Sequence, residues 1–216
     1  MPTYSIWLEP PPGPQRDALA ASIRRAACTG AGGPTFAPHV TLAGGVDLPT
    51  DRAASAAAAA VARALPPAGV PIALARSPTV GASYHKSVYL LAEPTPGLVA
   101  AAASAWAAAA ERRAGPSQAA GGSGRSPAAS PPPPQPPYMP HLSILYSEDE
   151  ATKAAVVAGM AEERRAGGEE GPDGEDDGGA PPPPPAWTRV TAWRTEGPVE
   201  GWECVADVGC GGGESG

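Results

Sequence analysis

Two stretches of the chain are so rich in proline and glycine that they cannot belong to a folded core. They cover residues 115–137, which end in a run of prolines, and residues 166–186, where an acidic cluster leads into a second run. Polyproline favours an extended, solvated backbone and lacks the N–H donors that a sheet requires. We therefore expect both stretches to be disordered surface insertions, like the glycine-rich tail at residues 208–216. The fold must be built from the remaining residues.

The remaining residues alternate between strand-like and helix-like segments. Strand patterns occupy residues 3–8, 38–43, 70–76, 87–91, 139–146, 187–194 and 202–205. Helical patterns occupy residues 15–27, 51–65, 97–113 and 148–165. Thr50 is the expected N-cap of the second helix, and Ser147 with Glu150 has capping-box spacing before the fourth. These segments predict an α+β fold with mostly antiparallel strands and with helices packed outside.

The formal net charge of −7 comes mainly from one segment and not from the residues expected to fold. Six of the 22 acidic residues lie in the second proline-rich stretch, namely Glu169, Glu170, Asp173, Glu175, Asp176 and Asp177. The 16 that remain nearly balance the 15 Lys and Arg residues. No stripe of basic residues follows the pattern that would track a nucleic-acid backbone. We therefore expect no strong nucleic-acid binding and no charge-driven partner, and we expect a monomer.

The sequence favours a soluble protein of the cytoplasm. Its first residues lack the basic and apolar segments of a signal peptide, and no apolar run is long enough to span a membrane. Three cysteines without a C-x-x-C pair are typical of a reducing compartment. We expect Cys28 and Cys204 to be buried as small apolar residues, with a disulfide between them left open.

The most informative feature is a short motif that occurs twice. Residues 38–42 read Pro-His-Val-Thr-Leu, and residues 140–144 read Pro-His-Leu-Ser-Ile. In a strand, residues i and i+2 lie on the same face, so each copy presents an imidazole beside a hydroxyl. A single copy would usually be structural, but the second copy in the corresponding half of the chain favours a catalytic pair. The side chains concerned are His39 with Thr41, and His141 with Ser143.

Two such half-sites facing each other suit the hydrolysis of a phosphodiester. One neutral histidine can take a proton from attacking water while the other, protonated, gives one to the leaving oxygen; an imidazole pKa near 6.5 allows both states at neutral pH. The hydroxyls would donate to the non-bridging phosphate oxygens. Val40 and Leu142, between the polar residues, are expected to point into the core and fix their orientation.

The paired motifs resemble those of the two-histidine (2H) phosphoesterases. The chain is most similar to the plant and yeast cyclic phosphodiesterases that act on ADP-ribose 1'',2''-cyclic phosphate. The resemblance extends over most of the chain outside the proline-rich insertions, which depart from the compact plant enzymes. The segments that carry it are residues 4–7 (Tyr-Ser-Ile-Trp), 36–41, 87–91 and 138–146.

This resemblance implies a bilobal catalytic domain over residues 1–207, with pseudo-twofold symmetry and the two motifs facing each other across a central groove. It implies metal-independent and cofactor-independent hydrolysis of ADP-ribose 1'',2''-cyclic phosphate, a by-product of tRNA splicing, to ADP-ribose 1''-phosphate. Nucleoside 2',3'-cyclic phosphates would be opened to 2'-phosphates. His39 and His141 are the implied acid and base, with a slight preference for His141 as the base. Thr41 and Ser143 would bind the phosphate, and Tyr146 would line the site.

Several aromatic residues have two interpretations. Tyr84 either stacks on a base of the substrate or fills the core. His85, in a turn or at a strand edge, is expected at the surface. Trp7, Trp193 and Trp202 are expected in the core, although one close to the groove could contact the substrate.

Two other functions remain open at this point. A 2H protein that trims RNA ends or resembles RNA 2',5'-ligases would need a basic surface, which the nearly neutral folded part does not favour. An inactive binding module could recruit partners through its proline runs. That interpretation leaves the intact histidines and hydroxyls unexplained.

Overall fold

One antiparallel sheet organises the fold. The computed structural model describes residues 1–113, 138–166 and 183–211. Within them, seven strands form a sheet in the order β4-β5-β6-β2-β1-β8-β9, and β3 pairs with β7 in a second small sheet. The strands are β1 (Thr3–Glu9), β2 (Val40–Asp47), β3 (Val70–Pro71), β4 (Thr79–Ser83), β5 (Lys86–Leu91), β6 (His141–Leu145), β7 (Ala186–Trp187), β8 (Arg189–Arg194) and β9 (Glu203–Gly209). The helices are α1 (Pro14–Ala27), α2 (Asp51–Ala64), α3 (Pro96–Arg113), α4 (Glu150–Ala166) and the short 3-10 helix η2 (Val199–Gly201).

The large sheet consists of two halves that meet at the two histidine motifs. Strands β4, β5 and β6 form one half, and β2, β1, β8 and β9 form the other. The residue pair that joins them is Val40 opposite Leu142, and both side chains are fully buried, as predicted. The α+β class and the antiparallel strands are confirmed. The two halves share one continuous sheet.

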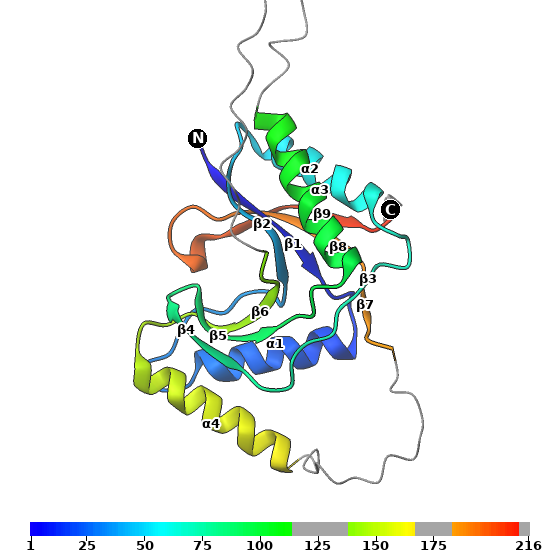
Figure 1. Cartoon of the computed structure of the whole chain (residues 1–216). Coiled ribbons are helices and arrows are strands. Elements are labelled where there is room, and N and C mark those ends of the chain that lie inside the picture. The colour runs from blue at the N-terminus through cyan, green and yellow to red at the C-terminus, as the bar shows by residue number, and fades with distance from the viewer. Residues whose placement is uncertain (114–137, 167–182, 212–216) are drawn as a thin grey trace, which may run out of the picture.

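Each half of the sheet has its own pair of helices. Helices α2 and α3 pack against β2, β8 and β9, whereas α1 packs against β6 and α4 against β5 (Figure 1). Helix α1 follows β1 directly in the chain but crosses to the other half. The two halves are therefore interlocked by the path of the chain.

Alanine allows α2 and α3 to lie close to the sheet. Their buried faces include Ala57, Ala58, Ala101 and Ala105, all fully inaccessible to solvent. Alanine has the highest helix propensity but buries little apolar area per side chain. The large buried side chains therefore come chiefly from strands, among them Trp7, Ile6, Leu8, Leu42, Ile144 and Trp187.

Strand β4 was not predicted from the sequence, and β3 is shorter than predicted. Residues 79–83 read Thr-Val-Gly-Ala-Ser and lack the apolar alternation that marks the other strands. Gly81 lies so close to the carbonyl of Lys86 that no Cβ would fit, so the approach of β4 to β5 requires glycine there. The predicted strand at residues 70–76 forms a ladder only over its first two residues, which pair with β7.

Helix α4 is capped by Asp149 rather than by the predicted Ser147. The Asp149 carboxylate accepts a hydrogen bond from the backbone N–H of Thr152 at 2.7 Å. The Ser147 hydroxyl instead accepts from the backbone N–H of Asp149 at 3.1 Å. Glu150 does not close a capping box but pairs with Lys153 at 2.7 Å. The prediction was wrong because Asp is as good an N-cap as Ser and stands two residues nearer the helix.

Ordered structure extends further than composition predicts. Ala166 ends α4, residues 183–185 lead into β7, and β9 continues to Gly209, so the prediction of disorder is wrong at these positions. The carbonyl of Pro185 accepts a hydrogen bond from Ile72 N at 3.0 Å, because proline lacks a donor but keeps its acceptor. Cys210 and Gly211, also in the predicted tail, are described and donate backbone hydrogen bonds to Thr188 and Ala62. Residues 115–137, 167–182 and 212–216 of the predicted disordered segments lie outside the described residues. No helix among the described residues is long and apolar enough to cross a membrane.

The predictions for the cysteines also need correction. Cys28 and Cys204 are exposed rather than buried, and both are free thiols, so no disulfide joins them. Cys28 follows the last residue of α1, and Cys204 lies on β9, the outermost strand of the sheet. Both positions lie next to solvent. The residue type alone, a small and weakly polar side chain, does not indicate this exposure.

Candidate active site

The pairing of β2 with β6 places the two motifs face to face. The two strands are joined at the middle residue of each motif. In an antiparallel ladder, the residues on either side of a pair step in opposite directions along the two strands. His39 therefore comes opposite Ser143, and Thr41 comes opposite His141. All four side chains line one groove of about 890 Å³.

The two imidazoles are held in the same way. Nδ1 of His39 lies 2.6 Å from the carbonyl oxygen of Ala37, and Nδ1 of His141 lies 3.0 Å from that of Met139. A carbonyl oxygen only accepts hydrogen bonds, so Nδ1 carries the proton in both neutral rings. Nε2 is then the atom of each ring that takes up or releases a proton.

His39 is the more deeply buried of the two histidines. Its side chain is 4% exposed, and the indole of Trp7 covers one face of its ring. Burial lowers the pKa of His39 to about 4, the hydrogen bond to Ala37 opposes this shift, and the charge of His141 adds to it. His39 is therefore neutral at pH 7.

His141 experiences the same influences at the other side of the groove. Burial lowers the pKa of His141, the hydrogen bond to Met139 raises it, and the positive charge of Lys86 lowers it further. The rings of Tyr89 and His141 pack edge to face with centroids 5.1 Å apart. Both histidines thus favour the neutral state when the groove contains no anion.

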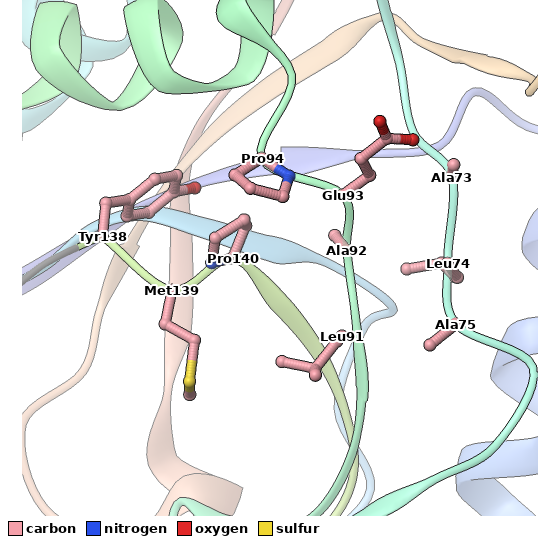
Figure 2. Close-up of a pocket in the computed structure, with 10 residues that line it drawn as sticks. All are labelled: Ala73, Leu74, Ala75, Leu91, Ala92, Glu93, Pro94, Tyr138, Met139 and Pro140. Carbon is pink, nitrogen blue, oxygen red and sulfur yellow. The ribbon is translucent and has the colours of Figure 1, made fainter.

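A short segment before β6 positions His141. Figure 2 shows Tyr138, Met139 and Pro140 following one another along a hollow that residues 73–75 also line. The Tyr138 hydroxyl donates to the backbone carbonyl of Thr41 at 3.0 Å, which ties this segment to the other motif. The carbonyl that orients the His141 ring belongs to the same segment.

The hollow in Figure 2 is not the site of the chemistry. It has a volume of about 510 Å³, and apart from Glu93 and the phenol of Tyr138 its lining is apolar. It contains no histidine. Tyr138 and Met139 line both this hollow and the groove, so the segment separates the two.

Aromatic side chains gather at one end of the groove. Trp202 lies nearly parallel to His85, with ring centroids 5.9 Å apart, and 6.2 Å from Tyr146. Tyr146 in turn stacks on Phe36 at 4.2 Å. Burial raises the pKa of Tyr146 to about 12, so its hydroxyl stays protonated at pH 7 and is a donor as well as an acceptor.

The other aromatic and histidine candidates for the site differ in whether they line the groove. Tyr146, His85 and Trp202 line the groove, and so does Trp7 although it is buried. Tyr84 is half-buried against His85 and Tyr146 and is not among the residues that line the groove. His85 is exposed, as predicted, but faces the site.

His85 and Ser87 form a third His-x-Ser pattern that the structure does not use as a half-site. Ser87 is fully buried, and its hydroxyl donates to the carbonyl of Leu145 and accepts from the N–H of Ser147. This hydroxyl is committed to holding β5 against β6. It cannot also donate to a ligand in the groove.

Strand β1 and helix α3 supply groove-lining residues that were not predicted from the sequence, apart from Trp7, which was named as a possible substrate contact. Thr3, Ser5 and Trp7 of β1 line the groove, together with Val99 and Trp106 of α3. Because Tyr4, Ile6 and Leu8 form the core face of β1, period-two alternation alone assigns residues 3, 5 and 7 to the opposite face. That signal was present and could have been used.

The groove has a simple charge distribution. Among the described residues, its lining includes no Asp or Glu, and Lys86 is the one Lys or Arg. Across residues 1–113, 138–166 and 183–211, no three His, Cys, Asp or Glu side chains are grouped so that they could hold a metal ion. The polar groups available for chemistry are imidazoles, hydroxyls and one ammonium.

Comparison with solved structures finds weak matches. Escherichia coli LigT complexed with ATP matches with a TM-score of 0.45 and 16% identity over 94% of this chain and 93% of that one. A crystal structure of a phosphoesterase matches with a TM-score of 0.46 and 15% identity over 94% and 93%. Kluyveromyces marxianus Usb1 matches with a TM-score of 0.37 and 10% identity over 94% and 97%. No curated protein sequence gives a match.

Comparison with protein families gives a match over nearly the whole chain. The family described as cyclic phosphodiesterase-like protein matches residues 1–209. This range contains both histidine motifs and every strand of the large sheet. The chain therefore belongs to the cyclic phosphodiesterase-like protein family of phosphoesterases.

Proposed function

We propose that the protein is a metal-independent cyclic phosphodiesterase that hydrolyses ADP-ribose 1'',2''-cyclic phosphate to ADP-ribose 1''-phosphate. Nucleoside 2',3'-cyclic phosphates are opened to 2'-phosphates by the same chemistry. The observation that carries this proposal is the facing pair of imidazoles in one groove, each with Nδ1 tied to a carbonyl and each accompanied by a hydroxyl.

The reaction needs one proton acceptor and one proton donor. A water molecule attacks phosphorus, and a neutral imidazole takes its proton through Nε2. The bond from phosphorus to one ring oxygen breaks, and a protonated imidazole gives a proton to that oxygen. The Thr41 hydroxyl donates to one non-bridging oxygen, and the Ser143 hydroxyl donates to the other after turning away from the carbonyl of His85, to which it donates at 3.3 Å without substrate. The negative charge of these oxygens increases in the transition state.

The electrostatics of the groove favour His39 as the base. Its pKa of about 4 keeps Nε2 free of a proton at pH 7. His141 is less buried, and the negative charge of a bound phosphate raises the pKa of a nearby imidazole, which allows His141 to hold the proton that the leaving oxygen needs. This assignment reverses the slight preference drawn from the sequence.

The aromatic end of the groove suits the nucleoside part of the substrate. Base–aromatic stacking requires exposed ring faces, and His85 and Trp202 present theirs nearly parallel at 5.9 Å. A planar base needs roughly 7 Å between two flanking rings, about 3.5 Å on each side. A small outward movement of the exposed His85 would admit one.

The groove offers little to a longer RNA chain. Single-stranded nucleic acid is usually followed by several cations along its backbone. The described residues that line this groove include one Lys or Arg, Lys86. A small nucleotide is therefore the better substrate class.

The test is hydrolysis of ADP-ribose 1'',2''-cyclic phosphate and of adenosine 2',3'-cyclic phosphate, with products separated by chromatography. His39→Ala and His141→Ala should each lower kcat by about 10²- to 10⁴-fold. His85→Ala is the matched control, because it removes a histidine from the same groove that has no free hydroxyl partner, and it should change KM more than kcat. Absence of turnover by a folded parent protein would refute the proposal.

A further inference from the structure

Within the part of the chain that the structure describes, Lys86 is the one Lys or Arg in the groove lining, and no acidic residue shares that lining. Among the described residues, no carboxylate forms an ion pair with its ammonium group. The second lysine of the chain, Lys153, is in contrast buried and paired with Glu150 at 2.7 Å. The Lys86 ammonium is thus free to bind an anion that enters the groove.

The backbone of Lys86 is firmly placed although its side chain is exposed. Lys86 begins β5 and pairs with Ser83 of β4. The next residue, Ser87, anchors β5 through hydrogen bonds to the carbonyl of Leu145 and the N–H of Ser147. A long flexible side chain therefore extends from a fixed point.

That fixed point lies beside the Ser143 side of the active site. The Ser143 hydroxyl donates to the carbonyl of His85, the residue directly before Lys86, at 3.3 Å. The charge of Lys86 is also felt by His141. Because Thr41, Ser143 and the two imidazoles already surround the place of the reacting phosphate, the donors of Lys86 remain for an anion next to it.

We propose that Lys86 binds a second phosphate group of the substrate, adjacent to the cyclic phosphate. The site then prefers cyclic phosphates that carry a diphosphate or a phosphomonoester over nucleoside cyclic phosphates that carry neither. This inference rests on the proposed function, whose first substrate, ADP-ribose 1'',2''-cyclic phosphate, contains a diphosphate. A lysine recognises such a group as a point charge with three donors, without demanding one fixed geometry.

The experiment compares two substrates that differ by one phosphate. These are adenosine 2',3'-cyclic phosphate and its 5'-phosphorylated form, with ADP-ribose 1'',2''-cyclic phosphate as a third substrate. For the parent protein, kcat/KM should be higher for both substrates that carry a second phosphate. Lys86→Gln should reduce this preference roughly fivefold at low salt, and mainly through KM. Loss for only one of the two substrates would identify its kind of phosphate as the bound one.

Arg52→Gln is the matched control, since it removes one positive charge from an exposed position on α2 that does not line the groove. It should leave the ratio between substrates unchanged. An equal loss of kcat/KM for all three substrates in Lys86→Gln would overturn the inference, because Lys86 would then act on the reacting phosphate or on His141. If the parent protein hydrolyses none of them, the proposed function fails instead. Binding of adenosine 3',5'-bisphosphate against adenosine 3'-phosphate then tests Lys86 separately.

Discussion

Trp7 lies flat against His39, with ring centroids 3.6 Å apart and planes 7° apart. Behind it, Trp193 stacks on Trp7 at 4.7 Å. The Trp193 indole N–H donates to the carboxylate of Glu9 at 3.3 Å and to the hydroxyl of Thr191 at 3.0 Å. A buried polar cluster therefore supports the stack that holds the His39 ring in place.

Replacing Trp7 should release the His39 ring and expose it to water. Because burial is the main cause of the low pKa of His39, Trp7→Leu should raise that pKa toward its usual value near 6.5. The acidic limb of the pH–kcat/KM profile then moves to higher pH, and kcat falls about 10- to 100-fold as the ring loses its orientation.

Trp202→Leu is the control for this prediction. Trp202 lines the same groove, but its ring is tilted by 56° from Trp7 at 6.0 Å and does not stack on His39. It should alter KM without moving the acidic limb. An unchanged limb in Trp7→Leu would contradict the role given to the stack.

Glu9 should matter to both stability and catalysis. Its carboxylate is 1% exposed, accepts from the Thr191 hydroxyl at 2.8 Å, and pairs with Arg16 at 3.3 Å and Arg189 at 3.4 Å. Glu9→Ala removes the carboxylate and leaves these partners without it. The free energy of unfolding should fall by about 3 kcal/mol, as measured by urea denaturation. The substitution should also lower kcat, because Trp193 loses one of its two acceptors and Thr191, the other, loses its own hydrogen bond to Glu9.

Glu9→Gln separates the two effects. The amide oxygen still accepts from Thr191 and Trp193, whereas the ion pairs with the arginines are lost. We expect kcat close to that of the parent with part of the stability missing. If Glu9→Gln lowered kcat as much as Glu9→Ala, support of the stack would not be the function of this side chain.

The local parts of the site follow from the sequence. The period-two pattern of a strand places each histidine beside its hydroxyl, and Val40 and Leu142 are buried as that pattern predicts. The N-cap of α2 is also confirmed, since Thr50 Oγ1 accepts from Ala53 N at 3.2 Å. These features depend only on neighbours within a few residues.

The long-range parts do not follow from the sequence. The stack of Trp7 on His39 depends on the pairing of β1 with β2, where Trp7 stands opposite Thr41. Lys86 reaches the groove because β5 pairs with β6. Periodicity gives the face on which a residue lies but not the strand that becomes its neighbour. For that reason the sequence does not distinguish Trp7, Trp193 and Trp202, whose positions relative to His39 differ in the structure.

Removal of divalent metals should leave turnover unchanged. In the proposed mechanism, two imidazoles carry out both proton transfers and two hydroxyls stabilise the phosphate oxygens. No step therefore requires a metal ion. Activity after dialysis against a chelator should equal that before it, and added Mg²⁺ or Zn²⁺ should not increase it. A loss that metal restores would refute the mechanism as drawn.

Acid should destabilise the protein partly through His39. The pKa of His39 is about 4 in the folded protein and near 6.5 when unfolded, so the unfolded chain binds more protons between these values. This contribution to stability is complete above pH 6.5 and is lost as the pH falls to about 4, and the total loss amounts to about 3 kcal/mol. Urea denaturation at pH 7 and pH 4.5 measures this loss of stability.

His39→Gln is the control for this prediction. Carboxylates that also titrate are common to the parent and to His39→Gln, so the variant should lose less stability between these two pH values. An equal loss in both proteins would mean that His39 is not held neutral by burial.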